Sequence, residues 1–148
     1  MHLLLASLLA VVASAPLALA GERSESMTVS ARVIARAVVS VESQPSEIVV
    51  TEADLARGYV DVEQPLELRV RTNSRRGYLF QVANSSEAFS ALELTFDQTR
   101  MTVVQESWVA RPYVPGGELV RAQVRVRLGP GAVAGRHPLP VEVSATPL

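Results

Sequence analysis

The chain has 148 residues, of which 48% are hydrophobic and 20% charged, and its 14 basic and 15 acidic residues leave a net charge of −1. This is the composition of a folded domain, and it excludes a disordered tail and a strongly basic nucleic-acid-binding protein. The chain contains no cysteine, which excludes disulfides, thiolate nucleophiles and cysteine-ligated metal centres.

The first twenty residues have the features of a cleavable export signal. An apolar run over residues 3–13 is shorter than the ~20 residues that a membrane-spanning helix needs. Pro16 interrupts the run, and Ala18 and Ala20 are small residues at the positions that signal peptidase reads. We therefore predict cleavage after Ala20 and no membrane span afterwards. A polar lead at residues 21–26 and one folded domain at residues 27–148 follow.

A long alternation opens the predicted domain. Every second residue from Met27 to Val41 is apolar, a period of two that is typical of a half-buried strand. The residues on this apolar side are Met27, Val29, Ala31, Val33, Ala35, Ala37, Val39 and Val41. The stretch is long for one strand, since strands usually run ~3–10 residues, so it is one long strand or two in sequence.

The next segment predicts a strand, one helical turn and a second strand. The first strand covers residues 47–50. Residues 51–58 predict the helical turn, because Thr51 can cap it and Gly58 can take the left-handed conformation that ends it. Residues 59–62 return to a strand.

The middle of the chain predicts a hairpin and two more strands. Residues 66–72 and 78–83 alternate on either side of a turn at residues 73–77, a pattern typical of a hairpin. Further strands are expected at residues 92–96 and 101–108.

The last third of the chain continues this pattern. A turn over residues 112–117 precedes a strand over residues 120–128, and residues 135–138 lead into a final strand at residues 139–144. Roughly eight or nine short strands with turns between them predict an all-β protein, a single antiparallel immunoglobulin-like β-sandwich. The alternation places Arg69, Arg125 and Arg127 outside and these residues inside: Val70, Phe80, Leu94, Val124, Val126 and Val141.

Few residues are available for catalysis. His137 is the one histidine beyond the predicted signal, and it precedes Pro138 at a strand entry, so we expect a surface turn residue. A nucleophile elbow of the form G-x-S-x-G is absent. We predict no enzymatic activity and no cofactor.

One acidic cluster could hold calcium through oxygen ligands. It comprises Glu52, Asp54, Asp61 and Glu63, but it lacks the D-x-D-x-D-G loop of calcium-binding hands. Helix capping accounts for Glu52 and Asp54 without a metal. We predict no metal site here.

Charges are distributed unevenly along the chain. Residues 42–67 carry a net charge of −6, and residues 68–148 carry +4. Candidate contact residues at outward strand positions are Arg69, Arg71, Arg125 and Arg127. They form either a solvated sheet face or part of a bipolar surface, suited to head-to-tail contact between subunits or to an anionic surface.

Two aromatic residues flank the Pro/Gly-rich turn and are further candidate contact residues. Trp108 and Tyr113 could form an adhesive tip. Because Trp108 falls in a strand pattern and most single tryptophans are largely buried, we expect Trp108 in the core and leave Tyr113 open.

Both ends of the predicted domain resemble one family. The opening Val29, Ala31 and Val33 and the closing Gly135, Val141 and Val143 are similar to the spore coat U / alternative chaperone–usher fimbrial subunits of Gram-negative bacteria. In that family a Thr-Tyr pair stands where this chain has residues 136–137, and cysteines are usual.

The resemblance implies a fold and a way of assembly. Such subunits have an immunoglobulin-like fold that lacks one strand, which a periplasmic chaperone supplies first and the N-terminal extension of the next subunit replaces. Residues 27–41 would then contain the strand-pairing segment, with candidate residues Met27, Val29, Ala31, Val33 and Ala35. The alternative is a complete sandwich whose first strand changes sheets near residues 35–37.

The resulting hypothesis is an exported, non-enzymatic fimbrial subunit or accessory protein in the periplasm or at the cell surface. Its partners would be a periplasmic chaperone, an outer-membrane usher and other copies of itself by strand exchange, and we expect no nucleic-acid partner. The alternative is a stand-alone periplasmic binding module that uses the arginine-bearing face or the Trp108–Tyr113 loop.

Overall fold

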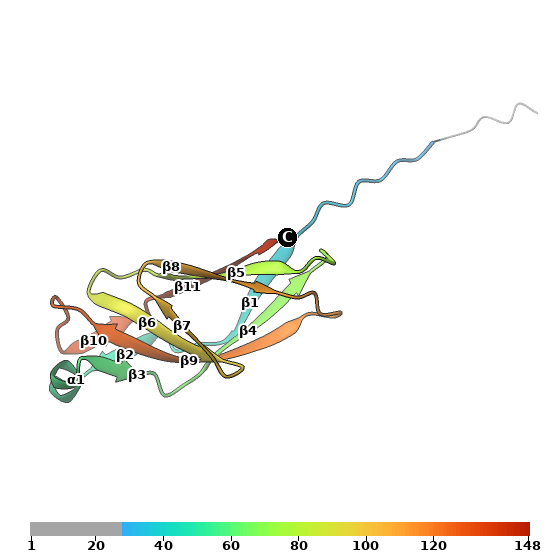
Figure 1. The fold of residues 1–148 in the computed structure, drawn as a ribbon. Helices are drawn as coiled ribbons and strands as arrows, with labels where there is room; N and C mark the ends of the chain where they lie inside the picture. Colours follow the sequence, from blue (N-terminus) through green and yellow to red (C-terminus); the bar gives the residue numbers. More distant parts are fainter. Residues whose placement is uncertain (1–27) are drawn as a thin grey trace, which may run out of the picture. The chain divides into compact units, whose positions relative to one another are not determined.

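The structure is a computed structural model that describes residues 28–148 (Figure 1). The predicted signal and lead (residues 1–26) and Met27 lie outside the described residues. Val33–Leu148 form one compact unit, and residues 28–32 belong to a separate unit. The described elements are β1 (Ala37–Ser43), β2 (Glu47–Val50), α1 (Glu52–Arg57), β3 (Tyr59–Asp61), β4 (Leu66–Thr72), β5 (Tyr78–Asn84), β6 (Phe89–Phe96), β7 (Thr99–Val103), β8 (Glu106–Arg111), β9 (Glu118–Leu128), β10 (Gly135–Pro138) and β11 (Val141–Pro147).

The strands form two antiparallel layers, as the sequence predicts. The first sheet has the order β1-β4-β9-β6-β7, and β3 also pairs with β9. The second sheet has the order β11-β5-β8, and β10 pairs with β2 in a short separate ladder. The hydrophobic core lies between the two layers, and the protein is an all-β sandwich.

The strand order corresponds to an immunoglobulin domain with one position empty. Immunoglobulin sheets contain strands A-B-E-D and strands C-F-G. The run β1-β4-β9-β6 matches A-B-E-D, β5 and β11 match C and F, and β7 and β8 are additions between D and E. Among residues 28–148, no strand occupies the position of G, at the outer edge of β11.

The predicted core residues are confirmed. Alternate residues of the central strands β4 and β5 face inward and are at most 1% exposed: Leu66, Leu68, Val70, Tyr78, Phe80 and Val82. Leu94, Val124, Val126 and Val141 are also buried. Burial of this kind contributes about 1.5–3 kcal/mol for each large apolar side chain.

The short helix α1 forms for the predicted reasons. Thr51 accepts a hydrogen bond from the backbone N–H of Asp54, and the Asp54 side chain accepts one from the backbone N–H of Thr51, which completes a capping box. Gly58 ends the helix with φ 81°, a left-handed conformation that favours glycine. Among the described residues, no helix is long and apolar enough to cross a membrane.

The predicted hairpin around residues 73–77 is wrong. β4 pairs with β1 and β9, whereas β5 pairs with β11 and β8, so this turn carries the chain from one sheet to the other. Gly77 has φ 96°, and a Cβ atom there would lie 2.2 Å from the carbonyl oxygen of Arg111. Alternation shows which residues face inward, but it does not show which strand is the partner.

Four boundaries also differ from the prediction. The first strand begins only at Ala37, because residues 28–36 form no ladder. The predicted strand at 101–108 is two strands, β7 and β8, in different sheets. His137 lies within β10, paired with Ile48, and not in a turn. No change of sheet occurs near residues 35–37: within the described chain, residues 28–36 are in no ladder, and β1 pairs with β4 alone from Ala37 onward.

Candidate strand-addition site

The edges of β1 and β11 face each other without a ladder. Their Cα atoms approach to within 8 Å, yet within the described residues β1 pairs only with β4, and β11 pairs only with β5. Each strand therefore presents a row of unpaired backbone N–H and C=O groups. We call this side of the sandwich, bounded by β1 and β11, the open side.

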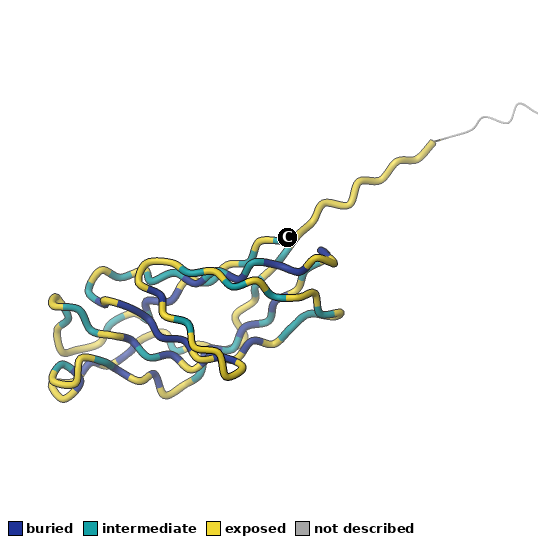
Figure 2. Tube along the Cα trace, in the orientation of Figure 1, coloured by how far each residue is buried: buried dark blue, intermediate teal, exposed yellow. Residues whose placement is uncertain are grey.

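The core is incompletely covered along the open side (Figure 2). Val70 and Val82 are 1% and 0% exposed, but their cross-strand partners Val39 and Val143 are only partly buried. Val41, which is paired with the fully buried Leu68, remains 50% exposed. Burial thus decreases from the central strands outward to β1 and β11. An added strand would cover these side chains.

The opposite side, bounded by β7 and β8, is protected, and we call it the closed side. The chain passes from β7 to β8 through only residues 104–105. Arg111 at the end of β8 lies over the ring of Phe96, 5.5 Å from its centroid. Its guanidinium binds Glu118 and, at 3.0 Å, Asp97.

A buried tyrosine completes the network of the closed side. The hydroxyl of Tyr78 donates to Oε2 of Glu118 at 2.7 Å. Burial, together with the hydrogen bond to Glu118, raises the pKa of Tyr78. The hydrogen bond with Glu118 also raises the pKa of Arg111, which keeps its charge throughout. No pattern in the sequence indicates this network, because it joins Tyr78 and Asp97 to residues 111–118 through contacts that only the fold creates.

Residues 28–36 form an exposed segment with the alternation of a strand. They belong to no helix or strand, and the side chains of Val29 and Val33 are 80% and 83% exposed. Val29, Ala31, Val33 and Ala35 have the same parity as Ala37 and Val39, which pack against the core. Met27 lies outside the described residues.

Asn73 fixes the point where this segment joins the sandwich. Its Nδ2 donates to the carbonyl oxygen of Ile34 at 2.9 Å, and its Oδ1 accepts from the backbone N–H of Arg36 at 2.6 Å. The backbone N–H of Asn73 also donates to the carbonyl oxygen of Arg36. The last residues before β1 are thus attached to the β4–β5 turn. No pattern in the sequence points to Asn73.

The candidate arginines all lie on the outer face of the first sheet, spread along β4 and β9, and three of them are neutralised. Arg69 pairs with Glu42 at 2.8 Å, Arg125 with Asp61 at 2.6 Å, and Arg127 with Glu93 at 2.5 Å. Arg71 makes no ion pair among the described residues and lies beside Arg36. The face is a lattice of ion pairs and not a continuous cationic surface.

Trp108 is not in the core, so that expectation is wrong. Its side chain lies on the outer face of β8 and is 54% exposed, opposite Gln81 of β5. Tyr113 is 38% exposed in the loop after β8. The alternation of β8 is regular, but its inward positions are those of Val109 and Arg111. Trp108 therefore lies on the second sheet, whereas the candidate arginines lie on the first.

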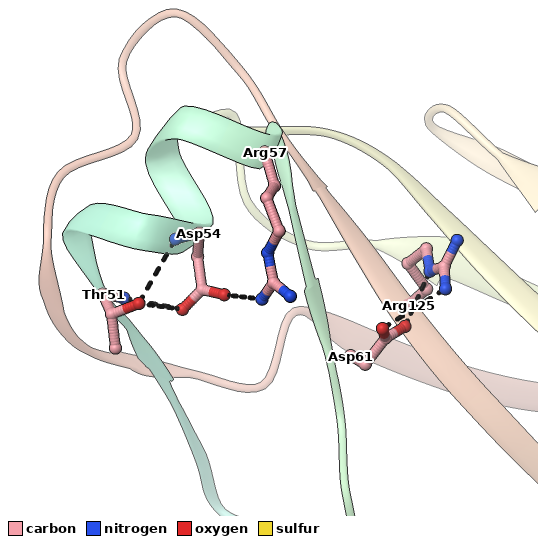
Figure 3. A network of polar contacts seen from close by, with 5 residues as sticks. All are labelled: Thr51, Asp54, Arg57, Asp61 and Arg125. Atoms are coloured by element: carbon pink, nitrogen blue, oxygen red, sulfur yellow. Dashed lines mark hydrogen bonds and ion pairs between the residues drawn. The ribbon is translucent and has the colours of Figure 1, made fainter.

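The two aspartates of the acidic cluster, Asp54 and Asp61, are held by protein contacts (Figure 3). Asp54 accepts from Thr51 and binds Arg57, and these hydrogen bonds, that from the Thr51 hydroxyl first, lower its pKa to about 2. Asp61 binds Arg125, whose guanidinium also lies 4.2 Å from the centroid of the Tyr59 ring. In residues 28–148 no three acidic or histidine side chains are placed to hold a metal ion.

His137 has no catalytic partner in its surroundings. Its ring meets that of Phe89 edge to face at 5.5 Å, and its Nε2 lies 2.8 Å from the carbonyl oxygen of Val133. These contacts are those of a packing residue at the β2–β10 ladder.

Comparison of the chain with protein-family models, with curated proteins and with solved structures gives no match. The features of the chain that bear on its function are therefore the geometry of the open side and the exposed segment that precedes β1.

Proposed function

We propose that this protein is an exported, non-enzymatic structural subunit that assembles by strand addition, as a fimbrial subunit or an accessory protein of such an assembly. Residues 28–36 of one copy add to the open side of another copy. The added strand pairs with the free edge of β11 and covers the partly exposed side chains of β1 and β11.

One observation carries this proposal: the open side and residues 28–36 are complementary in backbone hydrogen bonding and in apolar side chains. The open side offers unpaired backbone groups above apolar side chains, including Val39 and Val143. Residues 28–36 offer an apolar side chain at every second position and form no ladder of their own. Long, apolar and unpaired strand edges are aggregation hazards unless another strand covers them. Residues 28–36 can supply the strand that the open side lacks.

Addition requires a local movement of β1. Neighbouring strands lie ~4.8 Å apart, so a strand paired with both β1 and β11 would hold them about 9.5 Å from each other. Their Cα atoms now approach to within 8 Å. Because the described ladder of β1 is with β4 alone, part of β1 can move outward while the central strands stay in place.

The proposed setting follows from the predicted export signal. A Gram-negative periplasm or cell surface is where such a subunit would function, after cleavage behind Ala20. A periplasmic chaperone would cover the open side before assembly, and an outer-membrane usher would receive the subunit.

Deletion of the exposed segment is the first test. Removal of residues 22–32 from the chain that begins at Gly21 leaves the contacts of Asn73 with Ile34 and Arg36 in place. We expect a folded monomer that no longer polymerises, and its melting temperature should rise when a synthetic peptide of residues 27–36 is added. Loss of the cooperative thermal transition would instead identify the segment as an integral strand and contradict the proposal.

A matched pair of substitutions is the second test. Val33 and Ile34 are 83% and 76% exposed, so a glutamate at either position should leave the single subunit equally stable. Val33 has the inward parity of Ala37, whereas Ile34 has the opposite parity. Val33→Glu should therefore abolish assembly, and Ile34→Glu should preserve it, as measured by light scattering over a concentration series. Equal effects of the two substitutions on assembly would contradict the proposal that Val33, and not Ile34, faces the core of the acceptor.

A stand-alone binding module is the second candidate, favoured by the outer face of the second sheet. Trp108 stands beside Gln81, which accepts from Ser144 at 3.0 Å and donates to Glu106 at 3.0 Å. An exposed ring next to an ordered amide is suited to a small neutral ligand. If the chain stays monomeric at every concentration and does not bind the peptide of residues 27–36, this function is favoured over assembly.

A further inference from the structure

Charged side chains that form no ion pair gather at two ends of the sandwich. Most arginines of the described residues are paired, including those of the outer face of the first sheet. The arginines and glutamates that remain outside these pairs are mostly found where the strands begin or end. Their positions follow from the strand registers.

The end with free arginines is the one where β1 begins, and we call it the basic end. Ala37, the first residue of β1, pairs with Thr72, the last residue of β4, and the β4–β5 turn follows. Four exposed arginines at this end form no ion pair within residues 33–148: Arg36, Arg71, Arg75 and Arg76.

The end with free glutamates is the one where β5 ends, and we call it the acidic end. Glu142 of β11 and Glu106 of β8 both pair with Ala83 of β5, on either side of it. Glu87 lies in the loop that follows β5, and Glu52 begins α1, beyond β2. All four are exposed, and none forms an ion pair among the described residues.

We infer that the basic end of one copy docks against the acidic end of the next, and that these charges select the direction in which the added strand runs. This inference rests on the proposed function. β11 runs from the acidic end, where Val141 pairs with Asn84, to the basic end, where Pro147 pairs with Tyr78. The added segment leads directly into β1 at the basic end of its own subunit.

The two possible directions bring different ends together. A segment that runs antiparallel to β11 finishes at the acidic end of the acceptor, so the following β1 places the donor's basic end there. A parallel segment would finish at the acceptor's basic end and would bring two sets of four arginines together. Opposed charges favour the first arrangement, and like charges disfavour the second.

The resulting contact is heterologous, because two different surfaces meet. Such a contact repeats without closing unless a rotation brings it back to its start, so it produces a filament in which all subunits point the same way. The charges are exposed, and their interaction should weaken as salt shortens the Debye length from about 10 Å at 0.1 M to about 3 Å at 1 M.

Charge reversal tests the inference in the full chain that begins at Gly21. Arg75→Glu/Arg76→Glu changes the basic end, and Glu87→Arg/Glu142→Arg changes the acidic end. We expect each pair alone to weaken assembly on the order of tenfold or more at low salt, and the combination of all four to restore it. The matched control is the exchange Arg125→Asp/Asp61→Arg, which reverses a paired contact on the sheet face and should leave assembly unchanged.

Cross-linking tests the direction separately, since the chain has no cysteine of its own. Pro115→Cys marks the loop beside the basic end, where Gly117 lies against Arg71, and Ser85→Cys marks the acidic end. A short bis-maleimide should join position 115 of one copy to position 85 of another far more than it joins two copies of position 115.

The outcomes separate the inference from the proposed function. Binding of the peptide of residues 27–36 to the truncated domain should not change with Arg75→Glu/Arg76→Glu. Of the donor's basic end the peptide carries only Arg36, which would reach the acidic end of the truncated domain, opposite the two substitutions. Assembly that is unaffected by salt and by both charge reversals would contradict the inference but not strand addition. Cross-links between two copies of position 115 would do the same. A full chain that never assembles, with a peptide that never binds, would overturn both.

Discussion

The two sides of this sandwich meet the same physical problem differently. Each ends in strands with an unpaired edge, β7 and β8 on the closed side and β1 and β11 on the open side. On the closed side an inward-pointing arginine on an edge strand covers the core, and its charge is satisfied by Glu118 and Asp97. Inward-pointing charges are a known protection of sheet edges against pairing with other chains.

The open side has no equivalent protection among the described residues. The inward positions of β1 and β11 are held by small apolar residues, such as Ala37, Val39, Val143 and Ala145. These side chains are too short to cover the core alone, and they carry no charge that would resist an incoming strand. A single fold therefore contains one side whose edge is protected against strand addition and one side without that protection among the described residues.

Of the substitutions that compare the two sides, the removal of Arg111 should have the largest effect on stability. Arg111 and Glu118 are only 13% and 18% exposed in their side chains, so Arg111→Met leaves a largely buried carboxylate without its partner. We expect a loss of about 3 kcal/mol in the free energy of unfolding, measured by urea denaturation. Arg125→Met, which breaks an exposed pair, is the control and should cost less than about 1 kcal/mol. Equal losses would show that the closed side is not held by this network.

A second pair of substitutions compares the centre of the sheet with the open edge. Val70 and Val39 are cross-strand partners, but Val70 is 1% exposed and Val39 is partly exposed. Val70→Ala should cost about 2 kcal/mol and Val39→Ala less than about 1 kcal/mol in the truncated domain. In the presence of the peptide of residues 27–36, the cost of Val39→Ala should increase, because the bound strand buries that side chain. A constant cost would mean that the peptide does not reach the core.

Local chemistry in the sequence predicts much of this fold. The helix α1 depends on Thr51 and Gly58, whose capping properties are independent of distant contacts, so its bounds could be read directly. Alternation likewise places Val70, Phe80 and Val126 inside, because side chains of a strand point alternately to opposite faces. Such features can be predicted because they depend only on residues that are close together in the sequence.

Pairing between strands could not be predicted in the same way. The turn between β4 and β5 looks like a hairpin in sequence, yet it joins opposite sheets, since the hydrogen-bonding partner is not encoded in the alternation. Trp108 shows the same limit. The strand predicted to contain it, residues 101–108, is two strands, and the inward positions of β8 are those of Val109 and Arg111. Arg111 can face inward because Glu118 and Asp97 bind its guanidinium.

The candidate strand-addition site could be predicted from the sequence only in part. The apolar parity of residues 27–41 predicts a strand-pairing segment; of this stretch, residues 28–36 are exposed and in no ladder, whereas residues 37–41 belong to β1 and pair with β4. The acceptor edge required the fold, because β1 and β11 are almost a hundred residues apart in sequence. The free charges at the two ends likewise became visible only after Arg69, Arg125 and Arg127 were found in ion pairs.

The smallest expected effect concerns the tyrosine of the closed side, and it depends on pH. Tyr78→Phe removes the hydrogen bond to Glu118, and we expect a loss of about 1.5 kcal/mol in the free energy of unfolding at pH 8. Burial and the hydrogen bond with Glu118 raise the pKa of Tyr78 above its ordinary value of 10.0, so the folded state holds this proton more tightly than the unfolded state. The stability that depends on the proton is complete below pH 10 and is lost as the pH rises toward the folded pKa.

Tyr78→Phe has no proton to lose at this position, so its stability should fall less steeply than that of the parent chain above pH 10. Urea denaturation of both proteins between pH 8 and about pH 11 measures the difference, and groups that titrate elsewhere affect both chains and cancel. The gap of about 1.5 kcal/mol should therefore narrow with rising pH. A gap that stays constant would mean that the Tyr78 hydroxyl ionises equally well in the folded chain, and that the closed side is protected by Arg111 and not by the tyrosine beneath it.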